Sequence, residues 1–330
     1  MLKLSDFDYS LPKELIAQYP LKDRDAARLL VVERKRESIQ HCIFKDVAKY
    51  FKKSDLLVLN DTKVLPSRIK GKRLSGGKVE ILLLEPKTGL RFRAMLKPAR
   101  LKIGEKIVFN GSVISAVVNA SDEITFHAKD AASVYNLGVM PLPPYIKREP
   151  EPADNIYYQT VYAKEEGAVA SPTAGLHFTG EMLEDIKARG IDIAYLTLHV
   201  GLGTFRPVKS EDITKHKMEA EYFKVPAQTE NLIRKAKAGQ SRVIAVGTTS
   251  LRTLETHALG RSRGYTDLFI YPGYSFKIAD ALLTNFHLPR TTLLMLTAAF
   301  GGRELIKKAY QEAIVQKYRF YSYGDAMLII

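Results

Sequence analysis

The chain has 330 residues, enough for two domains or one large one, and it is 46% hydrophobic and 26% charged, as in ordinary globular proteins. Its one cysteine, Cys42, excludes an internal disulfide and a metal site built on several thiolates, and it fits a reducing compartment. The sequence shows no signal peptide and no apolar run long enough to span a membrane, so we expect a cytoplasmic protein with no membrane partner.

Positive charge is concentrated in one part of the chain. The whole sequence holds 50 Lys and Arg against 36 Asp and Glu, a net charge of +14. Residues 67–106 alone hold twelve basic and three acidic side chains, which accounts for most of this excess. A concentrated positive field predicts a polyanionic partner such as nucleic acid. A solvated basic face that aids solubility is the alternative.

The N-terminal part predicts alternating strands and helices. Residues 28–32 and 39–44 have the pattern of a hairpin, and Pro12 favours a helix start before them. Residues 55–59 form an apolar run typical of a buried strand, which ends in the polar residues 60–63. Polar residues at the carboxyl end of such a strand often bind ligands in open α/β sheets. An Asx turn or a helix cap is the alternative.

From residue 68 to about residue 127 the pattern changes to short segments in which apolar and polar residues alternate. Turn signals separate these segments at residues 76–77, 87–89, 110–111 and 120–122. Short, evenly spaced strands without helices predict a small barrel. We therefore predict an α/β catalytic domain of residues 1–67 plus 148–330, with a mixed sheet and flanking helices, and an inserted basic all-β barrel domain of residues 68–147.

Two loops of similar composition flank one predicted helix within residues 168–207. Each loop contains a histidine, His177 or His199, among small and hydroxyl-bearing residues with almost no charge. Thr179 is placed to cap the helix between them, and Gly190 is placed to end it. Such loops beside apolar strands are typical of the wall of a pocket for a polar, mostly uncharged ligand. A purely structural role for each histidine is the alternative.

A further hydroxyl-rich turn follows the strand predicted near residues 242–246. The turn contains Thr248, Thr249 and Ser250 and precedes a helix predicted at residues 251–258, whose free amides suit a carboxylate or a phosphate. The sequence contains no dinucleotide fingerprint, phosphate-binding loop or nucleophile elbow. From the residues alone, the chain is predicted to be an enzyme that acts on RNA with a small polar co-substrate.

Six segments closely resemble the signatures of one known family. They are residues 59–68, 138–147, 171–179, 199–207, 247–254 and 284–289. Together they resemble the S-adenosylmethionine:tRNA ribosyltransferase-isomerases of queuosine biosynthesis, and the similarity runs nearly end to end. The resemblance implies an α/β main domain interrupted by a β-barrel, which agrees with the change of pattern at Arg68.

The resemblance also implies an activity. A member of this family is a transferase that moves and isomerises the ribosyl part of S-adenosylmethionine onto the 7-aminomethyl-7-deazaguanine at the wobble position of tRNA. Epoxyqueuosine, adenine and methionine result. Because S-adenosylmethionine is consumed as a substrate, we expect no bound cofactor and no metal. The expected partner is a tRNA with a GUN anticodon that carries the precursor base, and the expected oligomeric state is a monomer.

The implied chemistry needs a base beside the sulfonium, and histidine suits that role near neutral pH. We expect His177 or His199 to be this base with His287 nearby, and Asp61 is the next candidate. Thr248, Thr249, Ser250 and Arg252 are expected to hold the methionine carboxylate. The other substrate-binding candidates are Asn60, Ser171, Thr173, Gly201, Thr204 and Asn285. The RNA-binding candidates on the predicted barrel are Arg68, Lys72, Arg73, Arg91, Arg93 and Arg100.

Two other classes of protein fit part of this pattern. Another S-adenosylmethionine-dependent enzyme that modifies RNA bases, such as a methyltransferase, would keep the ribosyl group intact. A non-catalytic RNA-binding protein would need the basic barrel but not the uncharged loops. Release of free adenine in the presence of tRNA distinguishes the expected activity from both.

Overall fold

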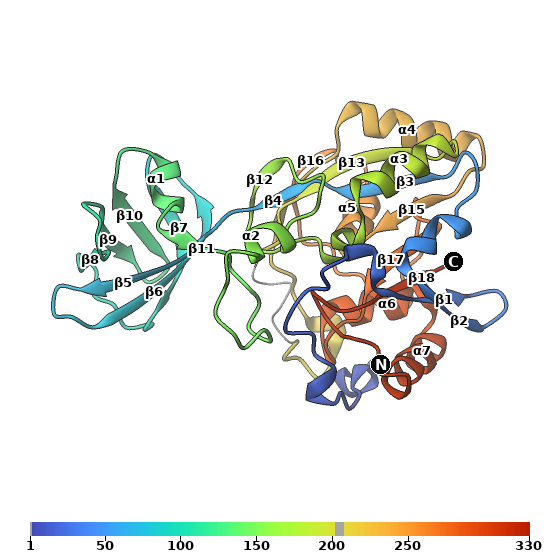
Figure 1. Cartoon of the computed structure of the whole chain (residues 1–330), viewed down its shortest axis with the longest axis horizontal. Helices are drawn as coiled ribbons and strands as arrows, with labels where there is room; N and C mark the ends of the chain where they lie inside the picture. Colours follow the sequence, from blue (N-terminus) through green and yellow to red (C-terminus); the bar gives the residue numbers. More distant parts are fainter. Residues whose placement is uncertain (1, 202–207) are drawn as a thin grey trace.

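A computed structural model describes residues 2–201 and 208–330 of the chain. It consists of a large α/β body and a smaller β body that lies to one side of it (Figure 1). The small body is joined to the large one by extended segments, and the termini both lie on the large body (Figure 1). This arrangement confirms the predicted fold class, a mixed sheet with flanking helices and an inserted barrel.

The large body is built on one nine-stranded sheet. In sheet order its strands are β16 (Arg263–Thr266), β14 (Glu221–Lys224), β13 (Asp192–Leu198), β3 (Leu56–Asn60), β15 (Val243–Val246), β17 (Ala281–Asn285), β18 (Ala326–Ile329), β1 (Arg28–Glu33) and β2 (Ser38–Ile43). The four strands from β13 to β17 run parallel, and β18 is antiparallel to β17. Strands β3, β15 and β17 are buried at every position, as expected where helices cover both faces of a parallel sheet.

Helices and short 3₁₀ turns cover the two faces of this sheet. The longer helices are α3 (Gly180–Ala188), α4 (Ala227–Ala238), α5 (Thr248–His257), α6 (Thr292–Gly301) and α7 (Arg303–Val315). The 3₁₀ turns include η1 (Leu4–Phe7), η2 (Lys13–Leu15), η3 (Arg24–Ala26), η4 (Phe44–Tyr50), η5 (Thr173–His177) and η7 (Ile213–Lys215). A short α-helix, α2, spans Asp154–Tyr157. Alternate residues of β1 enter different cores, Leu30 and Val32 in one and Leu29 and Val31 in the other, so both faces of the sheet are packed.

Local signals in the sequence account for some of these elements. The Thr179 side chain accepts a hydrogen bond from the amide of Met182 and so caps α3, which ends just before Gly190 as predicted. The helix start expected at Pro12 is only the short turn η2, with Pro12 at its N-cap. Leu11, Leu15 and Ile16 pack against the core. Ile16 forms an isolated β-bridge with Phe320, so the chain is extended there and the turn does not continue as a helix.

The small body is a closed barrel of six antiparallel strands. They are β5 (Arg68–Arg73), β6 (Lys78–Pro86), β7 (Arg91–Lys97), β10 (Glu123–His127), β9 (Ser115–Ala120) and β8 (Lys106–Val108), with β8 pairing back to β5. Strand β11 (Gly138–Val139) adds to β5 outside the ring, and helix α1 (Ala131–Tyr135) packs nearby. Strand residues alternate between a buried apolar interior and an exposed outer face, which is the period-two pattern of the sequence.

The chain passes between the two bodies at one place. Strand β4 (Thr62–Val64) leads toward the barrel, and strand β12 (Glu165–Ala168) pairs with it in parallel after the chain has returned. Figure 1 shows both strands at the side of the large body that faces the barrel. In the ranges 2–201 and 208–330, no helix is long and apolar enough to cross a membrane.

Candidate active site

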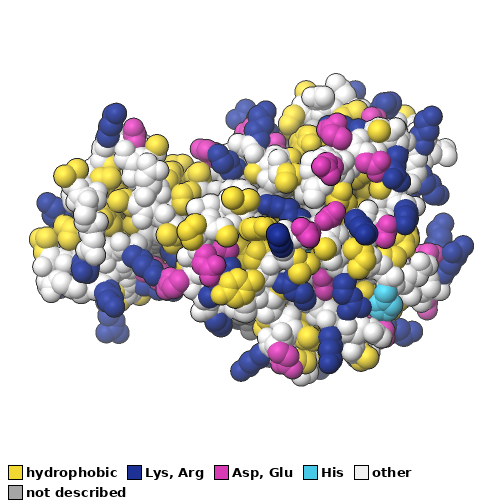
Figure 2. Space-filling model, viewed as in Figure 1, with side chains coloured by type: hydrophobic (Ala, Val, Ile, Leu, Met, Phe, Trp, Pro, Cys, Tyr) yellow, Lys and Arg dark blue, Asp and Glu magenta, His cyan; other side chains and the backbone are white. Residues whose placement is uncertain are grey.

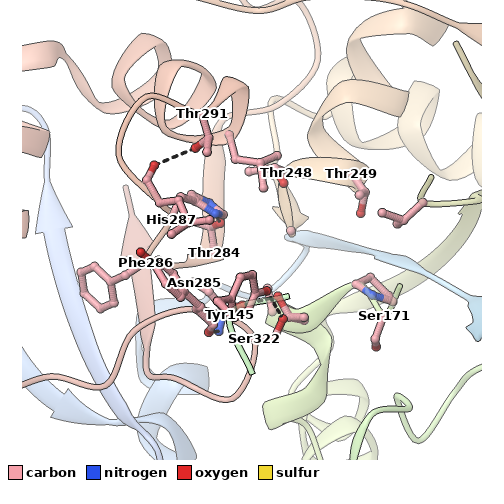
Figure 3. Close-up of a pocket in the computed structure, with 18 residues that line it drawn as sticks. Tyr145, Ser171, Thr248, Thr249, Thr284, Asn285, Phe286, His287, Thr291 and Ser322 are labelled. Carbon is pink, nitrogen blue, oxygen red and sulfur yellow. Dashed lines mark hydrogen bonds between the residues drawn. The ribbon is translucent and has the colours of Figure 1, made fainter. Parts of the chain in front are cut away.

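A cavity of about 60 Å³ lies at the carboxyl ends of the parallel strands β15 and β17 (Figure 3). Five segments of the large body and one side chain from the return connection line it. The lining residues are Tyr145, residues 171–174, Val200, residues 247–249, residues 284–288, Thr291, Leu293, Tyr321 and Ser322. None of these described lining residues carries a formal charge. A cavity this small holds only part of a ligand of ordinary cofactor size, so a larger ligand would extend beyond its mouth.

The first turn of α5 forms one wall of the cavity. Gly247, which precedes the helix, adopts a φ of 89°, a conformation that glycine tolerates and that turns the chain sharply from β15 into α5. Thr248 and Thr249 line the cavity, whereas Ser250 is fully buried and does not. The helix therefore begins three residues earlier than predicted, and the hydroxyl-rich turn is itself helical. The free amides of this first turn suit an anionic group.

Asn285, at the end of β17, connects the cavity to the core behind it. Its Oδ1 accepts a hydrogen bond of 2.9 Å from the Thr173 hydroxyl, and its Nδ2 donates to Nε2 of His177 at 3.2 Å. Burial lowers the pKa of His177 to about 4, so its imidazole is neutral at pH 7. The Phe44 ring packs against that imidazole. His177 therefore lies behind Asn285 and is not part of the cavity wall.

His287 lines the cavity directly. Its Nε2 lies 2.8 Å from the Thr284 hydroxyl, and burial lowers its pKa to about 3. Two tyrosines fix its backbone, because the Tyr9 hydroxyl donates to its carbonyl oxygen and its amide donates to the Tyr310 hydroxyl. Of the four catalytic candidates, His287 is the one whose side chain is in the described wall of the cavity (Figure 3).

A second polar group lies at the ends of β3 and β13. Nδ1 of His199 is 2.8 Å from the Thr62 hydroxyl, and the His199 ring stacks on Tyr222. Burial lowers the pKa of His199, although Glu165 opposes the shift. Asp61 accepts a hydrogen bond of 2.8 Å from Thr197, and burial raises the pKa of its carboxyl. These residues lie outside the cavity wall.

Asn60 joins this second group to the cavity. Its Nδ2 donates to the Leu198 carbonyl and to the Thr249 hydroxyl, at 3.0 and 3.2 Å. Its Oδ1 accepts from the amides of Thr62 and Leu198, at 3.1 and 3.0 Å. The amide group is fully buried, and its four hydrogen bonds are all made inside the protein. Asn60 therefore positions Thr249 and the ends of two strands.

Arg252 is buried on α5 and forms an ion pair with Glu221 of β14. The other carboxylate oxygen of Glu221 accepts a hydrogen bond of 2.6 Å from the amide of Gly201. Burial lowers the pKa of Arg252 to about 10, so the guanidinium still carries its charge at pH 7. Arg252 lines a second, smaller cavity, and Thr248 and Thr249 line both cavities. The remaining candidate, Thr204, lies outside the described residues.

Comparisons with known proteins decide the family. The model of the queuosine biosynthesis protein family matches residues 4–329. The chain belongs to this family. A protein from Sulfurihydrogenibium sp. named S-adenosylmethionine:tRNA ribosyltransferase-isomerase is 53% identical over 336 residues, covering 100% of both chains. One of the same name from Thermosipho africanus is 51% identical, over 99% of this chain and 100% of that one.

A solved structure supports the same placement. The S-adenosylmethionine tRNA ribosyltransferase of Thermotoga maritima is 38% identical, with a TM-score of 0.58 over 98% of this chain and 100% of that chain. The resemblance of the six sequence segments to the queuosine biosynthesis family is therefore confirmed. Residues 2–201 and 208–330 contain no cluster of three or more His, Cys, Asp or Glu side chains that could hold a metal ion.

The barrel pairs most of the predicted RNA-binding arginines with carboxylates. The pairs are Arg68–Glu80 at 3.3 Å, Arg73–Glu105 at 3.5 Å, Arg91–Glu123 at 3.2 Å and Arg93–Asp122 at 3.7 Å. Within the described part of the chain, Lys72 and Arg100 form no ion pair. Figure 2 shows the basic side chains of the barrel as separate projections, several with acidic side chains beside them.

Sequence reasoning missed several residues of the cavity wall. Tyr145, Tyr321 and Ser322 all line it, and the hydroxyls of Tyr145 and Ser322 lie 2.6 Å apart (Figure 3). Tyr145 falls in a segment that the family resemblance covers, so the resemblance was a signal for it. Tyr321 and Ser322 lie in a loop with no motif, and only the pairing of β18 with β17 brings that loop to the cavity.

Proposed function

We propose that this protein transfers and isomerises the ribosyl group of S-adenosylmethionine onto the 7-aminomethyl-7-deazaguanine wobble base of tRNA, giving epoxyqueuosine, adenine and methionine. One observation carries the proposal. Proteins named for this activity match the whole chain at 53% and 51% identity. The protein combines a hydroxyl- and amide-lined cavity with a basic barrel, which is what a small polar co-substrate and an RNA substrate would need.

The cavity is the proposed place of the proton transfers. The sulfonium acidifies the neighbouring ribose carbon, and a base must accept the proton that leaves it. Burial keeps the His287 imidazole neutral but also makes it a weaker base than free histidine, so its candidacy rests on its place in the cavity wall. We therefore rank His287 above His177 and His199, whose side chains lie outside the wall, while Asp61 stays a more distant candidate.

Other residues have proposed positioning roles. His177 accepts from the amide of Asn285 and so fixes which atoms of that amide face the cavity. Thr173, Asn285 and the Ser171 hydroxyl are proposed to bind the ribose or the adenine, and the Ser171 hydroxyl is buried without a hydrogen-bond partner among the described residues. Their donors and acceptors suit those groups, which are polar but uncharged.

The start of α5 is proposed to bind the methionine carboxylate. Gly247, Thr248 and Thr249 line the cavity, and the helix dipole favours an anion at this helix start. Arg252 adds positive charge behind these threonines, although Glu221 partly neutralises it. Ser250 faces the core, so its contribution is to the packing of the helix.

The remaining features of the proposal concern the partners. The RNA is proposed to be a tRNA with a GUN anticodon, the protein to be a cytoplasmic monomer, and S-adenosylmethionine to be a substrate with no further bound cofactor.

The division into residues 1–67 plus 148–330 and residues 68–147 stays a prediction. Limited proteolysis that cuts first near residues 65 and 148 would support that division.

Adenine release tests the proposed activity. The protein is incubated with S-adenosylmethionine labelled in the ribosyl group and with tRNA that carries the precursor base. The expected result is free adenine together with labelled RNA. A methyltransferase would leave the ribosyl label in solution and methylate the RNA, and a non-catalytic RNA-binding protein would bind the tRNA without releasing adenine. Either result contradicts the proposal.

A further inference from the structure

The outer face of the barrel has a hollow of about 460 Å³ over strands β5, β6 and the end of β7. Four lysines surround this hollow, and the only described acidic side chain in its lining is Glu80. The lining residues are Lys70, Gly71, Lys72, Lys78, Val79, Glu80, Lys97, Pro98 and Asn110. We refer to it as the lysine hollow.

The strand register places two of these lysines against each other. Lys72 is directly opposite Lys78 across β5 and β6, so both side chains leave the same outer face of the barrel. Both are exposed, and neither forms an ion pair with another described residue. Like charges in directly opposed positions of a sheet are destabilising, because their Cβ atoms are only about 4.5–5.5 Å apart. The fold thus tolerates a repulsion that a bound anion would relieve.

The neighbouring row of the hollow is partly compensated. Lys70 is opposite Glu80, and Glu80 is opposite Lys97, so one carboxylate lies between two lysines, and it also pairs with Arg68 at 3.3 Å. Lys70 also pairs with Glu149 at 2.7 Å, whereas Lys97 is 3.9 Å from Glu80. The uncompensated charge of the hollow is therefore concentrated at Lys72 and Lys78.

We propose that the lysine hollow is a site for the phosphate backbone of the tRNA, with Lys72 and Lys78 holding one phosphate group between them. Lysine is a point charge with several donors and suits a phosphate more than a base edge. The inference rests on the proposed function for the identity of the RNA. It assigns the phosphate contact to this face of the barrel, away from the arginines that Glu123 and Asp122 already neutralise.

The test compares two double variants that remove the same charge. Lys72→Ala/Lys78→Ala empties the hollow, and Lys87→Ala/Lys129→Ala removes two barrel lysines that do not line it. Binding of unmodified tRNA is measured at several salt concentrations without S-adenosylmethionine. Each lost phosphate contact lowers the slope of log affinity against log salt by about 0.7–0.9, and it weakens binding roughly tenfold near 0.1 M salt. We expect both changes in the hollow variant and at most a threefold loss in the control.

Three further measurements make the result decisive. The hollow variant should melt at the same temperature as the unaltered protein or higher, because the Lys72–Lys78 repulsion is removed. Lys72→Arg/Lys78→Arg should retain tRNA affinity within about threefold, since the positive charge is kept. Inorganic phosphate exchanged for chloride at constant ionic strength should not displace tRNA at low millimolar concentration. Displacement that depends on the two lysines would mean a site for small anions and would overturn the assignment to RNA.

Equal losses in the two double variants would also overturn the proposal, because only the general field of the barrel would then matter. So would unchanged affinity in both. The binding assay needs no catalysis, so its result is independent of adenine release, which tests the proposed function separately.

Discussion

The cavity of the α/β body and the outer face of the barrel differ in their polar side chains, which are uncharged in the cavity and charged on the barrel. The described wall of the cavity has hydroxyls, amides and a neutral histidine, and its polar atoms are largely bonded to one another. The barrel face has Lys and Arg side chains that pair with carboxylates at the surface. The cavity is suited to recognise a ligand by shape and hydrogen bonds, and the barrel is suited to recognise charge.

The difference also concerns rigidity. Groups such as the Asn60 amide are buried and use every hydrogen bond inside the protein, so the ends of β3 and β13 are fixed before any ligand binds. Exposed ion pairs are worth only about 0–1 kcal/mol each and exchange partners easily. The surface side chains of the barrel can therefore rearrange at little cost, whereas a side chain of the cavity cannot.

The largest effect is expected from removing the histidine of the cavity wall. His287→Ala should lower turnover by roughly 10²–10⁴-fold, the usual contribution of general acid–base catalysis. Turnover is measured as adenine release, and exchange of the ribose hydrogens next to sulfur with solvent deuterium reports the proton transfer itself. His41→Ala is the control, because His41 lies on β2 and contacts Tyr318 and Glu312 far along the sheet. If His177→Ala or His199→Ala stops exchange and His287→Ala does not, the base lies outside the cavity.

A buried ion pair behind the cavity should show the next largest effect. Arg252→Met removes the buried cation that pairs with the Glu221 carboxylate, and breaking a buried ion pair costs about 3–5 kcal/mol of unfolding free energy. Urea denaturation measures this loss. Arg252→Met/Glu221→Gln should recover part of it, because glutamine keeps an oxygen for the Gly201 amide and carries no charge. Equal stability of Arg252→Met and the unaltered protein would show that the pair is not buried as described.

Replacing Arg252 also tests whether this side chain binds the methionine carboxylate of S-adenosylmethionine. A charge-assisted hydrogen bond contributes on the order of 1.5–3 kcal/mol, so losing one to S-adenosylmethionine would weaken its affinity roughly tenfold or more. The measurement is made on Arg252→Met/Glu221→Gln, whose fold is better preserved. Unchanged affinity would assign the carboxylate to the α5 amides and threonine hydroxyls alone.

Lowering the pH should reduce the free energy of unfolding of the α/β body, because two of its buried histidines are neutral when the protein is folded. The pKa values of His177 and His287 are about 4 and 3 in the folded state, below the ordinary value near 6.5. The unfolded chain therefore binds more protons, so this part of the stability is present above pH 6.5 and is lost as the pH falls. Between pH 7 and pH 5 the loss is about 2 kcal/mol for each histidine. Chemical denaturation at both pH values measures it, and His177→Gln should show a smaller difference between them than the unaltered protein.

The smallest effects are expected on the paired face of the barrel. Arg91→Ala/Arg93→Ala/Arg100→Ala should change the unfolding free energy by only about 1 kcal/mol, because exposed ion pairs contribute little. The triple variant should also weaken tRNA binding less than Lys72→Ala/Lys78→Ala does, since Glu123 and Asp122 already neutralise two of its arginines. Filter binding at two salt concentrations compares the variants. A larger loss in the triple variant would place the RNA on the arginine face instead.

Much of the fold could be predicted because it depends on local pattern. Alternation of burial along β5 and β7 follows the period of a strand, and turns such as residues 110–111 separate neighbouring strands. Thr179 and Gly190 delimit α3 by cap chemistry alone. The sequence predicts too late a start for α5, because Thr and Ser favour caps over helix interiors. In the structure Thr248 and Thr249 are the first helical residues, directly after the turn at Gly247.

The site could be predicted only in part, because its pieces meet through the topology. Charge counted over residues 67–106 leaves out Asp122 and Glu123, yet β10 returns beside β7 and brings both to Arg93 and Arg91. The motif histidines look equivalent in the sequence, but only strand order decides that His287 enters the cavity wall while His177 lies behind Asn285. Such choices depend on contacts between distant parts of the chain.

The point of insertion also sets an order for synthesis. Strand β3 is made before the barrel, but both of its neighbours in the sheet, β13 and β15, are made after it. A ribosome therefore releases all six barrel strands, which pair only among themselves apart from β11, while β3 still has no partner. Domains generally fold as units in the order in which they emerge. The barrel should consequently be closed before the cavity forms. During synthesis the apolar strand β3 should stay unpaired while more than a hundred further residues are added, about the interval from Asn60 to Asp192.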